Sequence, residues 1–356
     1  MPLKKSGVRS LKSGVGRRAS ARQAGGGEAE KGKRGKGSRE GSSPPLPLSR
    51  PPGAKPGRSV AVVGAGRLGT ALARALASSG YEVLALVSRG AAGARRAAGR
   101  AGVRAAALSA ARLAELPPAD LIFITTPDDA IAATAGRLAD LYVASEARGR
   151  VVLHTSGALS SGVLAPLAAR GFAVGSMHPL AAVSEARAGA ESLRRAFYCV
   201  EGDARASRAA RRVVRDLGGR SFSISARDKA LYHAAAVMTA GHAVALFDTA
   251  ARLLAACGLT EARARAVLLP LFASTLGNLS GQTPARALTG SFARADVDTV
   301  RKHLAALRRA DVPGALAVYA LLGGLSLPLA LRNGADAAAL EEIERALAGK
   351  AVKRQP

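Results

Sequence analysis

The 356-residue sequence contains no tryptophan, only seven phenylalanines and five tyrosines, and only two cysteines. Cys199 and Cys257 cannot form a disulfide framework, and neither lies in a CxxC motif or a Cys/His cluster that would bind structural zinc. We therefore predict no metal site and a reducing, cytoplasmic compartment. With so few aromatic residues, the core must consist of alanine and aliphatic side chains.

Acidic residues are also scarce, with 25 Asp and Glu against 52 Lys and Arg and a net charge of +27. Residues 1–57 hold 14 basic and 3 acidic residues (+11), contain no aromatic residue and end in a proline-rich stretch. Such a composition predicts a disordered tail and linker, because it cannot bury enough apolar surface to offset its ordering entropy. The first 27 residues also resemble an organelle transit peptide, although a solvated basic tail is the preferred interpretation.

The charge of this tail allows, at most, nonspecific contact with nucleic-acid phosphates, because base stacking needs aromatic side chains that it lacks. One long run without a charged residue, 312–331, has the length of a membrane helix. Two prolines and three glycines interrupt it. We predict a buried helix there and no membrane partner.

From Ser59 onward, short apolar runs alternate with helical stretches rich in alanine and arginine. The runs are apolar on both faces, as in the buried strands of a parallel sheet. The predicted strands span 60–63, 82–87, 120–125, 151–154, 172–175, 197–201 and 221–225. The predicted helices beyond these strands span 228–257, 260–279, 296–310 and 311–332. This order predicts an α/β fold, a doubly wound Rossmann-like sheet at 58–225, followed by an all-α domain at 226–350.

A GxGxxG motif follows the first predicted strand and opens a helix, which is the arrangement typical of dinucleotide binding. Gly64 would make the tight turn, Gly66 would let the backbone approach a pyrophosphate, and Gly69 would allow close helix packing. Arg67 and Leu68 lie between these glycines, where the helix N-terminus meets the phosphates. The alternative is a glycine-rich turn without a ligand.

The end of the second predicted strand indicates which dinucleotide binds. NAD sites usually place an acidic residue there, whereas this strand ends in Ser88 and Arg89. A hydroxyl and a guanidinium suit a 2′-phosphate, so we predict NADP as the cofactor. The alternative for Arg89 is an ordinary surface arginine in an arginine-rich chain.

Small polar residues follow the next strands, at the edge where ligands of parallel sheets gather. Thr126 and Pro127 follow one strand, Ser156 follows the next, and His178 lies further on beside a proline. These residues are candidates for contact with nicotinamide, its ribose or the substrate. The alternative is that Thr126 and Ser156 cap the following helices.

Lys229 and His233 are four residues apart, so they share one face of the first helix of the predicted all-α domain. Of 11 lysines, only Lys229 and Lys302 lie between residues 58 and 349. A lysine where arginine otherwise supplies positive charge suggests a need for a titratable ammonium. Lys229 could polarise a substrate carbonyl and His233 could act as general acid or base. The alternative for Lys229 is a surface residue at a helix start.

Residues 59–340 resemble two-domain proteins that join a Rossmann-like NADP-binding domain to a helical domain of unknown function. These proteins are similar to ketopantoate reductase, pyrroline-carboxylate reductase and the 6-phosphogluconate dehydrogenase superfamily. The matching stretches are 64–69, 126–131, 154–159, 175–180, 232–236 and 288–294. The resemblance implies reduction of a small carbonyl or imine compound with NADP(H) in the cleft between domains. It also implies a homodimer.

Two departures from that pattern bear on catalysis. Gly241 stands where such proteins commonly carry an asparagine, and Ser291 and Ala295 replace a proline and a glycine. Without that asparagine, Lys229 would act alone or with Asn278. Arg294 is a candidate clamp for a substrate carboxylate. The alternative function is a protein that binds or senses NADP(H) without turning it over.

Overall fold

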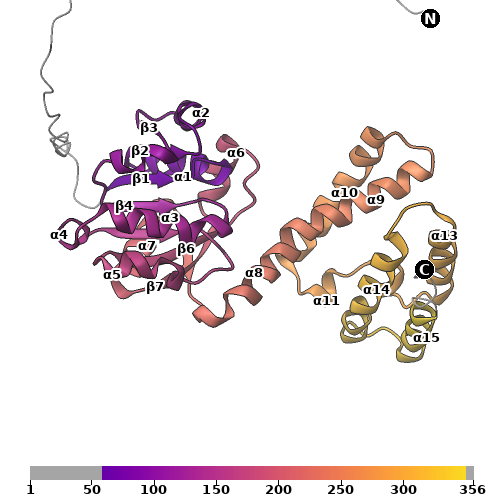
Figure 1. The fold of residues 1–356 in the computed structure, drawn as a ribbon. Helices are drawn as coiled ribbons and strands as arrows, with labels where there is room; N and C mark the ends of the chain where they lie inside the picture. Colours follow the sequence, from indigo (N-terminus) through magenta and orange to yellow (C-terminus); the bar gives the residue numbers. More distant parts are fainter. Residues whose placement is uncertain (1–57, 350–356) are drawn as a thin grey trace, which may run out of the picture. The chain divides into compact units, whose positions relative to one another are not determined.

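The computed structural model describes residues 58–349, so the predicted tail at 1–57 lies outside the described residues. The described chain contains one eight-stranded sheet with the order β3-β2-β1-β4-β5-β6-β7-β8 (Figure 1). Its strands are β1 (Ser59–Val63), β2 (Glu82–Ser88), β3 (Ala106–Ser109), β4 (Leu121–Ile124), β5 (Val151–His154), β6 (Ala173–Leu180), β7 (Phe197–Gly202) and β8 (Arg220–Phe222). Only β6 and β7 pair antiparallel within it. The predicted doubly wound fold is confirmed.

Helices cover both faces of the sheet, which explains why its central strands are apolar throughout. All residues of β1, β4 and β5 are buried. One face packs against α1 (Arg67–Ser78), α2 (Ala91–Ala101), α6 (Ala186–Leu193) and α7 (Ala204–Asp216). The other face packs against η1 (Ala110–Glu115), α3 (Asp128–Leu141), η2 (Ser161–Leu164) and α5 (Ala165–Ala169), with α4 (Ala144–Ala147) beside them. The sheet edge that carries the carboxyl ends of β1, β4 and β5 is therefore held between two helical layers.

After β8 the described chain is helical. The elements are η3 (Ala226–Asp228), α8 (Lys229–Val237), η4 (Met238–His242), α9 (Ala243–Ala256), α10 (Glu261–Gly281), α11 (Pro284–Ala287), α12 (Gly290–Ala293), α13 (Val297–Arg309), α14 (Ala315–Arg332) and α15 (Ala337–Ala348). The helix predicted at 228–257 is present as α8, η4 and α9, with a π-helical turn at η4. Leu304, Leu327 and Ile343 belong to the core of α13–α15.

The structure differs from the predicted strands at three places. The strand predicted at 221–225 is present as β8, which ends at Phe222. The sequence reasoning missed β3, because this edge strand has a single buried residue among four and its sequence, Ala-Ala-Leu-Ser, resembles the neighbouring alanine-rich helical stretches. It also ended the strand before β7 at residue 175, whereas β6 continues to Leu180. Residues 175–180 pair antiparallel with β7, and that partner keeps them extended.

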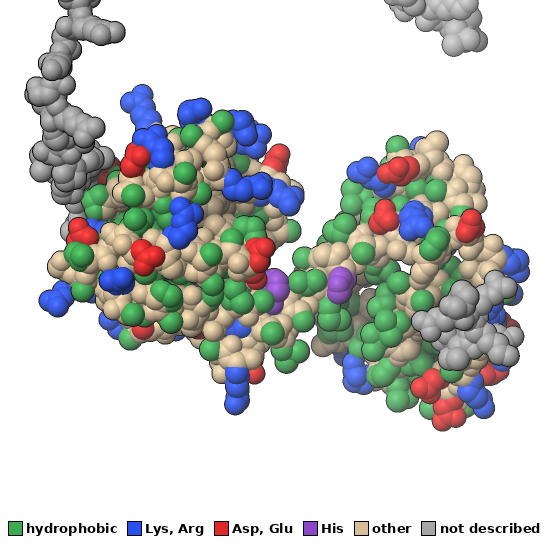
Figure 2. Space-filling view, viewed as in Figure 1, with side chains coloured by type: hydrophobic (Ala, Val, Ile, Leu, Met, Phe, Trp, Pro, Cys, Tyr) green, Lys and Arg blue, Asp and Glu red, His purple; other side chains and the backbone are tan. Residues whose placement is uncertain are grey.

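Much apolar surface is exposed on the helices after β8, and Figure 2 shows hydrophobic side chains gathered over this region. By length and composition, the helical stretches Ala226–Ala256 and Ala315–Arg332 could each cross a membrane. The prediction of a buried helix at 312–331 is wrong for the single chain, because only 22% of the apolar window in α14 is buried. Leu327 and Ala330 face the core of α13–α15, whereas Leu321 and Leu325 face solvent.

Candidate active site

The glycine turn after β1 packs directly against the end of β4. Gly64 has a φ of 115°, and a Cβ there would lie 2.5 Å from the backbone of Thr125 and Thr126. A Cβ on Gly69 would lie 2.3 Å from the carbonyl oxygen of Gly64. A Cβ on Gly66, in contrast, would meet nothing closer than 4.0 Å. Packing therefore requires the first and third glycines, and the open space over the middle one suits an approaching phosphate.

Helix α1 begins directly beside this open space. Its N-cap, Gly66, provides no side-chain hydrogen bond, and the first turn of α1 contains no acidic residue. Arg67, the first residue of the helix, is exposed. Unpaired N–H groups and the positive end of the helix dipole favour a bound anion at such a position.

Beyond the turn lies a cavity of about 690 Å³ between the start of α1, helix α2 and the segment that leads into α6. Its lining includes the guanidinium side chains of Arg67, Arg96, Arg100 and Arg187, together with Glu185. Ser88 and Arg89 are not part of this lining; the Ser88 hydroxyl donates to the carbonyl oxygen of Gly90 at 3.1 Å. Sequence reasoning missed Arg96 and Arg187, because nothing distinguishes them from other arginines of an arginine-rich chain.

The carboxyl ends of β4 and β5 present hydroxyl groups with different surroundings. The hydroxyl of Thr126 is buried and has no hydrogen-bond partner among residues 58–349. The hydroxyl of Ser156 donates to Asp128 at 2.8 Å and accepts from the N–H groups of Ala158 and Leu159 at 3.1 and 3.0 Å. Ser156 thus stabilises the turn after β5 and does not cap the following helix η2, whose N-cap is Ser160. The predicted ligand contacts of Ser156 and Thr126 stay predictions.

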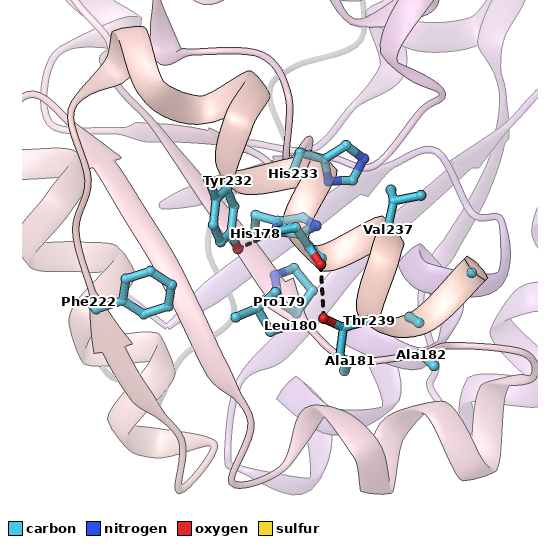
Figure 3. A pocket seen from close by; sticks show the side chains of 14 residues that line it. His178, Pro179, Leu180, Ala181, Ala182, Phe222, Tyr232, His233, Val237 and Thr239 are labelled. Carbon is cyan, nitrogen blue, oxygen red and sulfur yellow. Dashed lines mark hydrogen bonds between the residues drawn. The ribbon is translucent and has the colours of Figure 1, made fainter. Parts of the chain in front are cut away.

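Two histidines and a tyrosine lie close together (Figure 3). The ring of His178, on β6, lies 5.4 Å from the ring of His233, on α8, and its Nδ1 is 2.7 Å from the hydroxyl of Tyr232. A Cβ on Gly157 would lie 2.3 Å from Nδ1 of His233 and 2.9 Å from His178. Only glycine at position 157 leaves room for both imidazoles. Nδ1 of His233 is buried and has no partner in the described part of the chain.

Burial fixes the protonation of this cluster. It lowers the pKa of His178 to about 4, and the nearby His233 and Lys229 act in the same direction. Burial also raises the pKa of the Tyr232 phenol. At neutral pH the cluster therefore contains a neutral His178 and a protonated Tyr232, so the hydrogen bond between them joins two uncharged groups.

Lys229 lies behind this cluster rather than in it. Its side chain is 1% exposed, and its ammonium donates to the carbonyl oxygen of Ser156 at 3.1 Å and to the hydroxyl of Ser176 at 2.5 Å. The carboxylate of Glu201 lies 3.8 Å away. Burial lowers the pKa of Lys229, and Glu201 opposes that shift. These contacts hold the start of α8 against the ends of β5 and β6, and the proposed catalytic role of Lys229 stays a prediction.

A pocket of about 570 Å³ opens beside His178 and His233, between the end of β6, Phe222 and the helix α8–η4. Apart from His178, Tyr232, His233 and Thr239, its lining is apolar or glycine. Asn278 and Arg294, predicted near the substrate, do not line it. Within residues 58–349 no group of His, Cys, Asp or Glu could hold a metal ion.

Two family models match the chain. Residues 49–179 match the Rossmann-like domain, and residues 196–325 match a domain of unknown function, DUF2520. No curated protein sequence matches the chain.

The match to solved structures with the same fold extends over nearly the full length of those proteins. A candidate NADP oxidoreductase from Bacteroides fragilis is 24% identical, with 76% of this chain and 98% of that chain covered and a TM-score of 0.63. A protein from Thermotoga maritima is 23% identical, with coverages of 77% and 99% and a TM-score of 0.59. A reductive aminase from Aspergillus terreus, in complex with NADPH and ethyl levulinate, is 19% identical, with coverages of 80% and 98% and a TM-score of 0.54. At these identities the likeness establishes the fold. The chain thus joins a Rossmann-like domain at residues 49–179 to a DUF2520 domain at residues 196–325.

Proposed function

We propose that the protein is an NADP(H)-dependent oxidoreductase that reduces a small carbonyl or imine compound. The observation that carries this proposal is the unpartnered Nδ1 of His233, buried where the pocket meets the carboxyl edge of the sheet. Structural neighbours described as an NADP oxidoreductase and as a reductive aminase with NADPH support the same chemistry.

A line of contacts joins the glycine turn to this histidine. Gly64 packs on Thr126 at the end of β4, and Asp128 bonds Ser156 at the end of β5. The next residue, Gly157, lies beneath His233. The strands β1, β4, β5 and β6 are parallel neighbours, so the contacts cross three strand spacings, about 14 Å, along one edge. An extended dinucleotide lying along that edge would reach from the turn to the pocket.

The residues of this chain fit the parts of NADP(H). The open space at Gly66 and the N-terminus of α1 would hold the pyrophosphate, and the free hydroxyl of Thr126 would contact the nicotinamide half. Arg67 and Arg96, which line the cavity beyond the glycine turn, would bind the 2′-phosphate, and the role of Ser88 and Arg89 stays a prediction. When bound, NADPH supplies the hydride.

At the reacting end, His233 would donate a proton to the oxygen or nitrogen atom that gains negative charge during reduction. The neutral pair of His178 and Tyr232 would hold the imidazole of His233 in place. Lys229 would act as a positioning residue, because its ammonium fixes the start of the helix that carries His233.

The decrease in NADPH absorbance during incubation with candidate substrates measures turnover and tests the proposal. The wild-type protein should consume NADPH with at least one member of a panel of small ketones and cyclic imines. His233→Ala should lower kcat by about 100-fold, as expected for loss of a general acid, and should leave NADPH affinity unchanged. His242→Ala is the matched control, because His242 is exposed on η4 and does not line the pocket. Equal turnover by both variants would contradict the assignment of His233.

Gly241 favours a second candidate function, in which the protein senses NADP(H) without turnover. It lines the pocket and supplies no side-chain donor at the position where the related reductases carry asparagine. Tight NADPH binding without absorbance loss for any compound would support that function.

A further inference from the structure

We infer that the substrate is an uncharged, largely apolar carbonyl or imine compound, without the carboxylate that the arginine clamp predicted from sequence would bind. This inference rests on the proposed function and assigns its substrate class. It comes from the side chains that line the pocket beside His178 and His233 and from the space at Gly241.

No Lys, Arg, Asp or Glu side chain of the described chain lines the pocket. Pro179 and Leu180 form the wall on the sheet side, and Ala236, Val237 and Ala240 form the wall on the helix side. A carboxylate placed there would lose part of its hydration to apolar walls without gaining a lysine or arginine partner, which costs free energy. The walls therefore select against a negatively charged substrate.

Three of the four polar side chains that line the pocket lie at one end of it (Figure 3). His178, Tyr232 and His233 cluster where reduction would take place. The fourth polar residue, Thr239, donates its hydroxyl to the carbonyl oxygen of Ala235 at 2.9 Å and is therefore already paired. A ligand with one polar atom at the reacting end and hydrocarbon elsewhere matches this distribution.

The nearest ammonium group cannot serve a carboxylate either. Lys229 is 1% exposed, and its donors are directed to Ser156, Ser176 and Glu201. Arg294, the predicted clamp, does not line the pocket. Among residues 58–349, the chain thus places no lysine or arginine at the substrate.

Gly241 enlarges the pocket on its helix side. A Cβ at this position would meet only Cγ1 of Val237, at 3.8 Å. Glycine inside a helix costs about 1 kcal/mol relative to alanine, and the φ of Gly241 is not one that requires glycine. The missing side chain instead leaves room, so a ring or branched substituent fits where an asparagine would otherwise project.

The reduction proposed for this site adds one hydride and one proton to the C=O or C=N bond of the substrate. The hydride forms a new C–H bond at the carbonyl or imine carbon, and NADPH becomes NADP⁺. The π electron pair of the double bond would move to oxygen or nitrogen, which would take a proton from the imidazole of His233. Solvent then restores that proton.

Matched pairs of compounds test the inference with the full-length protein. Cyclohexanone is compared with 3-oxocyclohexane-1-carboxylate, and 2-methyl-1-pyrroline with 1-pyrroline-5-carboxylate. The uncharged member of each pair should have a kcat/KM about 10-fold higher, since a partly desolvated carboxylate without a lysine or arginine partner costs roughly 1.4 kcal/mol. A preference for either carboxylate would overturn the inference.

A second measurement separates failure of this inference from failure of the proposed function. If no compound consumes NADPH, calorimetry of the NADP⁺-saturated protein still reports which ketone binds. Binding of cyclohexanone and not of its carboxylate would support the substrate class although the oxidoreductase proposal had failed. Binding of the carboxylate alone would overturn the substrate class.

Two variants sharpen the result. Leu180→Arg places a cation in the pocket wall and should shift the preference toward the carboxylates by at least about 10-fold. Leu141→Arg is the matched control, because Leu141 on α3 is equally exposed, at 39%, and does not line the pocket. Gly241→Asn should lower kcat/KM for cyclohexanone and not for acetone. A preference unchanged by Leu180→Arg would count against the pocket as the substrate site.

Discussion

At the scale of single residues, the site depends on the absence of a side chain at position 157. A Cβ there would lie 2.3 Å from Nδ1 of His233 and 2.9 Å from His178, so Gly157→Ala must displace both rings. We expect turnover to fall at least 100-fold and the free energy of unfolding to fall by about 1–3 kcal/mol. NADPH affinity, measured by calorimetry, should change little, because the glycine turn is unaffected.

The control for that variant is Gly136→Ala on α3. A Cβ at Gly136 meets nothing within 4 Å, so this change should leave turnover unchanged and stabilise the helix slightly. Normal turnover in Gly157→Ala would show that the two histidines are not held as described.

A second prediction at this scale concerns pH. Burial lowers the pKa of His154 to about 4, as it does for His178. Unfolding returns each imidazole to a pKa near 6.5. The unfolded state therefore binds more protons between pH 6.5 and 4, and stability falls as pH decreases through that range, by about 3 kcal/mol per histidine at the lower end.

Chemical denaturation at pH 7 and pH 5 measures this loss. His154→Gln should flatten the pH dependence, since it removes one of the two buried imidazoles. The variant also loses the hydrogen bond that the N–H of Ser156 donates to Nδ1 of His154 at 3.2 Å. This loss lowers the free energy of unfolding equally at both pH values. An unchanged slope would contradict the assignment of His154 as a neutral buried histidine.

At the scale of elements, the position of α8 depends on Lys229. Lys229→Met keeps the length of the side chain and removes its bonds to Ser156 and Ser176. We expect a loss of about 3–5 kcal/mol in stability, because Glu201 then lacks its buried partner. The pH profile of kcat decides between the two roles of this lysine: a positioning role lowers the whole profile without changing its shape, whereas loss of one limb would show direct proton transfer.

The elements also show which parts of the structure were predictable. Strands β1, β4 and β5 were predicted almost to the residue, because each is buried on both faces and reads as a continuous apolar run. The extension of β6 depends on antiparallel pairing with β7, and pairing between distant segments leaves no local pattern. The π-helical turn η4 has no pattern of its own either.

In the candidate site, too, features that depend on adjacent residues were predictable, and features that depend on contacts between distant segments were not. The glycine turn was recognised because its residues are adjacent in the sequence. The roles of Gly157 and Tyr232 were missed, because each follows from a contact with another strand or helix. Lys229 was singled out correctly as unusual, but its burial could not be foreseen from a helix start next to Asp228.

At the scale of the whole molecule, the exposed apolar surface of α8–α10 and α14 predicts a homodimer. Leu231, Val244, Leu269, Leu271, Leu321 and Leu325 are all at least 60% exposed. Apolar patches of this kind rarely remain open to water, and a second copy of the chain supplies a matching surface. Mass photometry should give a dimer, and Leu269→Glu with Leu271→Glu should shift it to the monomer. A monomeric wild-type protein that floats with liposomes would point to a membrane surface instead.

The packing of the glycine turn has a consequence for how such sequences evolve. A lineage that abandoned the nucleotide would still need Gly64 and Gly69, because any larger residue there collides with the backbone of the domain. Only Gly66, with open space above it, is free to drift. In descendants of this chain, replacement of Gly66 would therefore indicate that the nucleotide no longer binds. Conservation of Gly64 and Gly69 would indicate only that the domain still folds.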